Sequence, residues 1–111
     1  MATGDPIDPQ VLDFLDQHIR SIEQLEILLL LLAHSDRIWT ARDVSVELRG
    51  NESSTASRLD ELARDGLIQR WDQPTCEYRY ERSPALDALM GRVADCYSRF
   101  RLRMIERIFK K

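Results

Sequence analysis

Cysteine and histidine are scarce in this sequence, which limits the metal chemistry open to it. Two cysteines, Cys76 and Cys96, and two histidines, His18 and His34, occur among 111 residues. Neither cysteine belongs to a C-x-x-C pair, and no histidine follows one at metal-ligand spacing. We therefore expect no metal site and no cofactor. We expect both thiols to be reduced and to fill small apolar positions.

The sequence also lacks a long hydrophobic run. The longest, "ILLLLLA" from Ile27 to Ala33, covers seven residues, whereas a helix that crosses a bilayer needs roughly 20. Residues 1–8 lack the basic cluster and apolar stretch of a signal peptide. These observations predict a cytoplasmic protein with no membrane partner.

Motifs that mark common catalytic sites are missing as well. The sequence has no Gly-rich phosphate loop, no H-E-x-x-H and no G-x-S-x-G. The serine-rich stretch "ESSTAS", residues 52–57, has no histidine nearby in sequence, so helix capping and an exposed polar face explain it better than a nucleophile does. We expect that the protein is not an enzyme.

What the sequence does contain is typical of a small globular domain. Apolar residues make up 43% and charged residues 32%. The formal net charge of −3 is unevenly spread, because residues 92–111 hold seven basic and two acidic side chains. Such a basic end is consistent with a solvated flank of a dimerisation helix, with a DNA-backbone contact, or with a membrane or partner surface.

The first half of the chain predicts two helices. Residues 1–8 should form a mobile leader, after which Asp8 caps a helix that starts at Pro9. Ser21 and Gln24 match a capping box at the start of a second helix. Because the second helix is apolar on almost every side, it should be buried all round at the centre of the core.

A helix-turn-helix follows. Thr40 is a good N-cap with Asp43 at the third helical position, and Gly50 suits the left-handed residue that commonly ends a helix. Asn51 caps the next helix, which ends at Gly66. Two short helices joined by a Gly-containing turn are typical of a helix-turn-helix.

The remainder predicts a β-hairpin and a long final helix. "LIQRW" and "CEYRY", around the turn "DQPT", read as two antiparallel strands. Ser83 and Pro84 then begin a helix that continues for about 27 residues, longer than a small domain needs. We expect a mainly α fold with a small β-hairpin, in which residues 9–83 form one domain and residues 84–111 form a dimerisation helix.

The segment "TARDVSVELRGNESSTASRLDELARDGLIQRW" and the hairpin "CEYRYERSP" resemble the winged helix-turn-helix fold. The style is broadly that of MarR- and PadR-like bacterial transcription regulators, and the phrase "LDELARDGLIQR" is typical of the junction between reading helix and wing. The resemblance covers roughly residues 21–83, and the final helix is similar to the dimerisation helices of such regulators. It implies a homodimer that binds double-stranded DNA.

The resemblance also implies which residues meet DNA. The helix 51–64 would enter the major groove, and its outward face would hold Ser53, Ser54, Ser57, Arg58, Glu61 and Arg64. Serine hydroxyls bond to phosphate or base edges, and Arg58 suits a bidentate guanine contact. The wing residues Gln73, Thr75 and Arg79 would touch phosphate or the minor groove. Thr40 and Arg42 would hold the backbone.

Acidic residues in the reading helix oppose this interpretation. Glu52, Asp60, Glu61 and Asp65 offset its two arginines, whereas DNA-binding surfaces are usually basic. Pairing of Asp60 and Asp65 with Arg64 and Arg58 would reduce the conflict. The alternative function is therefore a winged-helix adaptor that binds a protein and not DNA.

The role of five aromatic residues between positions 39 and 97 remains open at this point. They either close the small core or line a pocket beneath the wing for an effector of unknown identity. These residues are Trp39, Trp71, Tyr78, Tyr80 and Tyr97.

Overall fold

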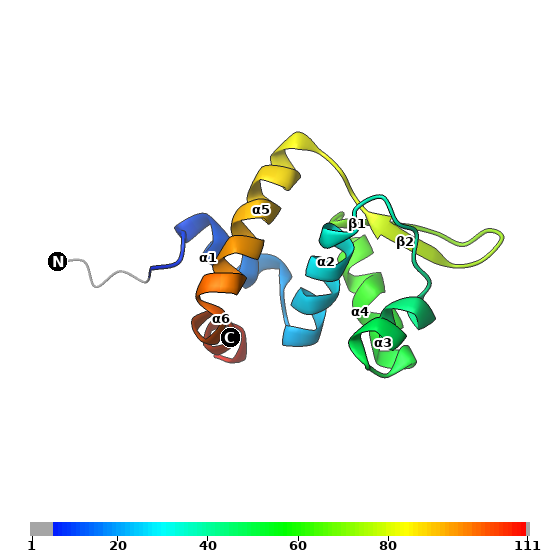
Figure 1. Cartoon of the computed structure of the whole chain (residues 1–111), viewed down its shortest axis with the longest axis horizontal. Helices are drawn as coiled ribbons and strands as arrows, with labels where there is room; N and C mark the ends of the chain where they lie inside the picture. Colours follow the sequence, from blue (N-terminus) through cyan, green and yellow to red (C-terminus); the bar gives the residue numbers. More distant parts are fainter. Residues whose placement is uncertain (1–5, 111) are drawn as a thin grey trace. The chain divides into compact units, whose positions relative to one another are not determined.

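The computed structural model describes residues 6–110, and Figure 1 shows the order of its elements. Within that range lie six helices and two strands. In chain order these are α1 (Pro9–His18), α2 (Ile22–Ala33), α3 (Ala41–Leu48), α4 (Glu52–Arg64), β1 (Ile68–Trp71), β2 (Glu77–Tyr80), α5 (Pro84–Arg99) and α6 (Arg101–Phe109).

The chain divides into two compact units. The first, which we call the helical unit, consists of Met1–Ile22 and Ser83–Lys111 and contains α1, α5 and α6. The second, the hairpin unit, is Glu23–Arg82 and holds most of α2, then α3, α4 and both strands. The expected division at residues 8 and 83 differs from this one, because α1 packs against α5 and α6.

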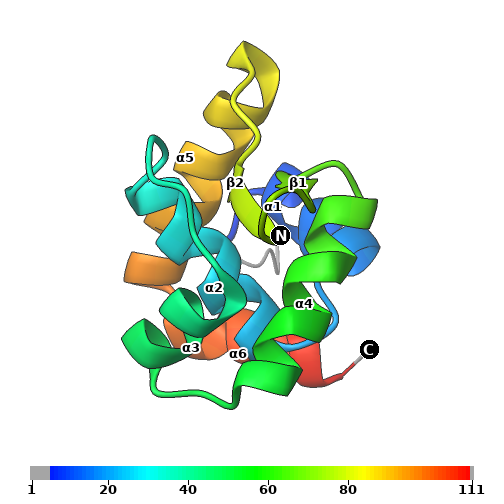
Figure 2. The ribbon, with the colours of Figure 1, turned by 90° about the vertical axis from the view of Figure 1, so that its right-hand side faces the viewer.

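All helices and strands of the hairpin unit contribute side chains to one core. α3 packs against α4, α4 packs against β1 (Figure 2), and fully buried leucines and aromatics fill the interior, among them Leu25, Leu28, Leu59 and Leu62. α2 is not buried all round, since Leu29, Leu30 and Leu32 are half-buried. An apolar run of seven residues covers every side of a helix, but the neighbours of α2 cover only part of it.

β1 and β2 form an antiparallel hairpin whose register pairs Ile68 with Tyr80 and Trp71 with Glu77. Trp39 adds a bridge on the far side of β2, where its backbone N–H and C=O bond to Tyr78 at 2.8 and 2.7 Å. The turn of the hairpin extends away from the helices of this unit (Figure 1). The predicted hairpin is therefore confirmed.

Helix caps agree closely with the sequence signals. Asp8, Thr40, Asn51 and Ser83 each accept a backbone N–H from the first turn of α1, α3, α4 and α5 respectively. Gly66 has a φ of +78° after the end of α4. The left-handed residue after α3, however, is Arg49 (φ 56°, ψ 40°), so assigning that conformation to Gly50 was wrong.

The single final helix that the sequence predicted is broken at Phe100. Its backbone (φ −131°, ψ 43°) ends α5 and begins α6. The break allows α6 to pack on both α1 and α5, with Met104 and Ile108 buried. A continuous helix would carry these side chains away from α1. The apolar spacing on either side of Phe100 fits one straight helix equally well, so the sequence pattern did not indicate the break.

The predicted leader, residues 1–8, lies mostly outside the described residues. In its described part, the side chain of Ile7 is only 2% exposed and Asp8 caps α1. Residues 6–8 therefore belong to the fold. Both cysteines are free, Cys76 half-buried and Cys96 buried. The expected apolar position was wrong for Cys76, whose thiol contacts Arg70 and the Tyr78 hydroxyl.

Candidate nucleic-acid interface

The helix-turn-helix is built from α3, α4 and a three-residue turn. A capping box holds the start of α3, since the Asp43 N–H donates to Thr40 Oγ1 (3.1 Å) and the Thr40 N–H donates to Asp43 Oδ2 (3.0 Å). These bonds lower the pKa of the Asp43 carboxyl, the backbone bond from Thr40 being the largest cause. Asn51 Oδ1 accepts the Ser54 N–H at 2.9 Å and fixes the start of α4.

One face of α4 is open to solvent. Ser53, Ser57 and Arg64 are exposed, and their spacing of four and seven residues places them on one side of the helix. The Ser57 hydroxyl donates to the Ser53 carbonyl at 3.3 Å, a local bond that solvent or a ligand can replace. The polar face expected from the sequence is therefore present over these three positions.

Two other predicted contacts on α4 already have partners inside the hairpin unit. Ser54 is half-buried, and its hydroxyl donates to Glu23 Oε1 at 2.7 Å. Arg58 Nη2 donates to Glu61 Oε2 at 2.9 Å, while Arg58 Nε is buried without a hydrogen-bond partner among the described residues. Arg58 must leave Glu61 before it can bond to a guanine.

The acids of α4 pair differently from the expectation. Asp60 Oδ1 accepts the Tyr78 hydroxyl at 2.7 Å and lies 3.5 Å from Arg70 Nε, so it does not pair with Arg64. Arg58 pairs with Glu61 and not with Asp65. The predicted pairing was thus wrong in its partners, because the wing strands supply Tyr78 and Arg70 beside α4.

Tyr78 lies at the centre of a small polar cluster at the base of the wing. The Cys76 thiol donates to the Tyr78 hydroxyl at 3.3 Å, and Arg70 Nε donates to Cys76 Sγ at 3.4 Å. Burial, followed by the hydrogen bonds to Cys76 and Asp60, raises the pKa of the Tyr78 phenol. These contacts join the wing to α4 and explain Tyr78 as a structural residue and not as part of a ligand pocket.

The wing residues differ in their availability. Gln73 and Thr75 are exposed in the turn between β1 and β2. Arg79 is half-buried, and its Nη2 donates to Gln69 Oε1 across the strand pair at 3.1 Å. At the start of α3, Arg42 is exposed, whereas the Thr40 hydroxyl is already engaged as the N-cap.

The structure therefore brings the nine predicted DNA contacts onto one unit but leaves only part of them available. The exposed ones are Arg42, Ser53, Ser57, Gln73 and Thr75. The sequence-based set omits Arg49, which is exposed in the turn between α3 and α4. The assignment of Gly50 as the left-handed residue hid it, since that assignment makes Arg49 an ordinary helical position.

Other kinds of site find little support in the described part of the chain. Residues 6–110 contain no group of three or more His, Cys, Asp or Glu side chains that could hold a metal ion. None of their helices is both long enough and apolar enough to span a bilayer.

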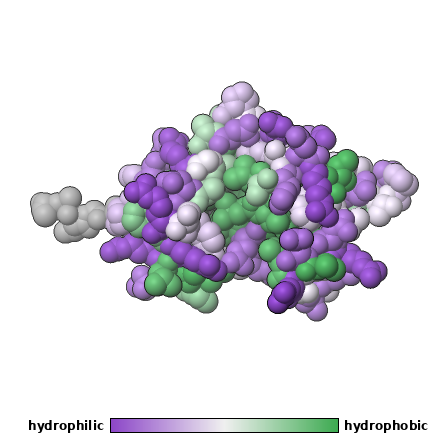
Figure 3. Space-filling model, viewed as in Figure 1, coloured by the Kyte–Doolittle hydropathy of each residue, from purple (hydrophilic) through white to green (hydrophobic). Residues whose placement is uncertain are grey.

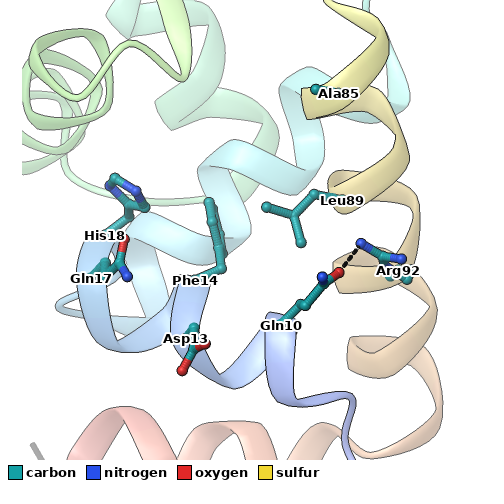
Figure 4. Close-up of a pocket in the computed structure, with 8 residues that line it drawn as sticks. All are labelled: Gln10, Asp13, Phe14, Gln17, His18, Ala85, Leu89 and Arg92. Atoms are coloured by element: carbon teal, nitrogen blue, oxygen red, sulfur yellow. Dashed lines mark hydrogen bonds between the residues drawn. The ribbon is translucent and has the colours of Figure 1, made fainter.

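The helical unit has an open groove between α1 and α5, shown in Figure 4. Its volume is about 370 Å³, with Phe14, Ala85 and Leu89 as its apolar lining. Arg92 at one end donates to Gln10 Oε1 and lies 3.6 Å from Asp8. Because this arginine is already paired, the groove offers no free cation to an anionic ligand.

Comparison with known proteins gives the class of fold first. The helices and the antiparallel hairpin define a mainly α, winged-helix-like protein, as two solved structures indicate. One is reduced HlyU from Vibrio cholerae, with a TM-score of 0.57 and 22% identity over 81% of this chain and 88% of HlyU. The other is the ST1889 protein from Sulfolobus tokodaii, with a TM-score of 0.55 and 18% identity over 83% of this chain and 96% of that one.

Sequence comparison adds a different likeness. The chain is 30% identical to a subunit of NADH-quinone oxidoreductase from Francisella tularensis subspecies novicida and subspecies tularensis, over 93% of its own length. It spans about a quarter of the length of these curated relatives. No family model matches the chain.

Proposed function

We propose that this protein binds duplex DNA and regulates transcription. The observation that carries the proposal is the open face of α4, where Ser53, Ser57 and Arg64 line one side of the second helix of a helix-turn-helix. Hydroxyl and guanidinium groups at the surface of such a helix suit phosphate oxygens and base edges. Gln73 and Thr75 at the exposed hairpin turn suit a second contact.

The likeness to HlyU, a winged-helix transcription regulator, supports the same function. The closer resemblance to MarR- and PadR-like regulators is part of the proposal, as is a cytoplasmic location. The segment shared with the NADH-quinone oxidoreductase protein covers a quarter of that relative, and we propose no catalytic activity from it. No effector is proposed.

We further propose that the protein is a homodimer formed through the helical unit. α6 leaves Leu102 and Phe109 in solvent, at 78% and 76% exposure, and Ile105 on the same stripe is half-buried. Figure 3 shows hydrophobic atoms gathered over this helix. A second copy that covers this stripe would remove the exposed apolar surface from water, and a dimer would present two reading helices to a two-fold DNA site.

Titration of the full chain against labelled duplex DNA of mixed sequence tests the proposal. We expect binding at low salt that weakens steeply as salt rises, because released counterions drive association with the phosphate backbone. Absence of binding at low salt would overturn DNA binding. Fluorescence anisotropy at two salt concentrations is sufficient for the measurement.

A second candidate function, a protein-binding adaptor, is favoured by a different observation. The hairpin unit holds 12 acidic and eight basic side chains, and Val46 of α3 is 69% exposed. An acidic surface with an exposed apolar side chain suits a basic protein partner better than DNA. The adaptor function is the correct one if the full chain does not bind DNA at low salt and if Val46→Asp disrupts a complex that the chain forms with another protein of its host cell.

A further inference from the structure

The cations of the hairpin unit are all arginines, and most of them are already in use. Between positions 23 and 82 the sequence contains eight arginines and 12 acidic residues. The engaged ones and their partners are Arg37 over the Trp39 ring, Arg58 with Glu61, Arg70 with Asp60 and Asp72, Arg79 with Gln69, and Arg82 with Asp36. Intramolecular pairing lowers the free energy that these groups can gain from phosphate.

Three arginines remain available. Arg42, Arg49 and Arg64 are exposed and make no hydrogen bond or ion pair through their side chains with any residue from 6 to 110. A phosphate contact at one of these positions breaks no existing pair. The unpaired cations are therefore the best candidates for contacts that set affinity.

Arg49 differs from the other two in its backbone. Its N–H donates to the carbonyls of Ser45 and Val46, and the Gly50 N–H donates to the Ser45 carbonyl at 2.8 Å. With Asn51 capping α4, the whole turn is held at both ends. The base of the Arg49 side chain is thus fixed between the two helices of the helix-turn-helix, as a positioning contact requires.

The conformation of Arg49 is an unusual one for its residue type. Residues with a Cβ seldom adopt a φ of 56°, and glycine or asparagine is preferred there. Gly50 is the next residue, yet its φ lies outside the left-handed range. The chain therefore places an arginine at the strained position of an exposed turn, and such positions often serve function.

Arg42 and Arg49 stand at the two ends of α3. Arg42 is in the first turn of the helix, and Arg49 follows its last residue, Leu48. Both side chains are exposed, as is that of Val46 between them in the sequence. The charge of Arg42 also acts on the neighbouring Asp43 carboxylate, so Arg49 is the less restrained of the two cations.

We propose that Arg49, together with Arg42, anchors the helix-turn-helix on phosphates of duplex DNA. The inference rests on the proposed DNA binding and assigns its affinity to the arginines at the two ends of α3. Guanidinium groups bind phosphate oxygens in a bidentate manner. Such contacts fix the protein on the duplex and carry no sequence information.

Substitution of Arg49 in the full chain tests this assignment. Arg49→Gly removes the guanidinium and keeps the left-handed turn, while Arg49→Lys keeps the charge. We expect Arg49→Gly to weaken binding to labelled mixed-sequence DNA roughly tenfold at low salt, and to reduce the slope of log affinity against log salt by about one. Arg49→Lys should retain the slope. Arg82→Ala, which removes an exposed arginine paired with Asp36, is the matched control and should change both quantities less.

The outcomes separate the two proposals. If the wild-type chain fails to bind DNA at low salt, the proposed function is lost and the anchor with it. If the wild type binds but Arg49→Gly keeps its affinity and salt slope, only the anchor is overturned. A loss confined to one DNA sequence would make Arg49 a base contact and also overturn it. Circular dichroism checks folding, and Arg49→Asn, which tolerates the same backbone, replaces a glycine variant that does not fold.

Discussion

In the hairpin unit, the exposed face of α4 carries polar side chains. In the helical unit, α6 leaves the apolar side chains of Leu102 and Phe109 in solvent. The charges differ too. The hairpin unit has 12 acidic and eight basic side chains, whereas residues 92–111 of the helical unit hold an excess of five positive charges. Most arginines of the hairpin unit have a partner within that unit. The hairpin unit thus has mostly paired arginines and a few free ones, with Val46 as its most exposed large apolar side chain. The helical unit has two such side chains, Leu102 and Phe109, on one helix, and they are more exposed still.

This difference suggests that recognition and assembly are separate tasks of the two units. A unit whose charges are paired gains specificity from a small number of free side chains, because each further contact must first break a pair. An exposed apolar stripe lacks that restriction and favours association with another apolar surface. Substitutions in each unit show whether the two tasks can be disturbed independently.

The largest effect is expected from truncation of a buried side chain in the core of either unit. Leu62 in α4 and Met104 in α6 are both fully buried. Replacement of either by alanine should lower the free energy of unfolding by about 3 kcal/mol, because it removes buried apolar surface and leaves a cavity. Urea denaturation followed by circular dichroism measures the loss.

The same two variants sharpen the comparison when each is also tested for binding. At low denaturant, Leu62→Ala should weaken DNA binding more than self-association, and Met104→Ala should do the reverse. Equal losses of both properties in both variants would contradict a division of tasks. Ser98→Ala, a change at an exposed site of α5 outside the proposed contacts, is the control and should alter neither stability nor binding.

The second effect concerns assembly through α6. Phe109→Asp places a charge on the exposed stripe and should raise the dimer dissociation constant by at least about 100-fold, since an apolar side chain of this size contributes about 1.5–3 kcal/mol when buried and a two-fold interface contains it twice. Sedimentation velocity across a concentration series gives the constant.

Val46→Asp supplies the control for that experiment. Val46 is exposed to a similar degree, 69% against 76% for Phe109, but lies in the hairpin unit. It should leave the dimer unchanged. A wild-type chain that stays monomeric at tens of micromolar would remove the assembly role from α6, and dissociation by Val46→Asp would move it to α3.

Much of the hairpin unit was predictable from sequence because its signals are local. Thr40 with Asp43, Asn51, Gly66 and the strand alternation each act within a few residues, and each is found in the structure. The break at Phe100 carries no such signal. It follows from how α6 packs on α1, and the spacing of apolar residues on either side is equally compatible with one straight helix.

The candidate interface was predictable in part for the same reason. Periodicity correctly placed Ser53 and Ser57 on the open face of α4. It could not show that Ser54 bonds to Glu23, or that Tyr78 and Arg70 occupy Asp60, because these partners come from distant parts of the chain. Nor could it distinguish Arg49 from Gly50 as the left-handed residue, since glycine is the usual choice.

A smaller effect is expected at the start of α3, the helix that carries the proposed phosphate anchor. Thr40→Ala removes the acceptor of the Asp43 N–H and should lower the free energy of unfolding by about 1 kcal/mol. The stability of the wild type should also depend on pH through Asp43, whose pKa is lower in the folded chain than its usual value of 3.8.

The sign of that dependence follows from linkage. A carboxyl with a depressed pKa in the folded state contributes stability above the pKa of the unfolded chain, and the contribution is lost as pH falls through the folded value. Asp43→Asn should therefore flatten the decline of stability below about pH 4, measured by thermal unfolding at a series of pH values. A variant that declines as steeply as the wild type would show that other carboxylates cause the loss.

The smallest expected effect tests how far pairing within the hairpin unit suppresses DNA binding. Glu61→Gln removes the charge that holds Arg58 at 2.9 Å, so Arg58 can turn toward phosphate and DNA affinity should rise several-fold at low salt. Its stability should change by less than about 1 kcal/mol, because the pair is partly exposed. Glu106→Gln makes the same change of net charge on α6 of the helical unit and is the matched control. If both variants raise the affinity equally, net charge explains the gain and the Arg58–Glu61 pair does not limit recognition. If only Glu61→Gln raises the affinity, Glu61 weakens DNA binding by holding Arg58 in an ion pair. The acid in the reading helix would then limit a contact to DNA that Arg58 is otherwise able to make.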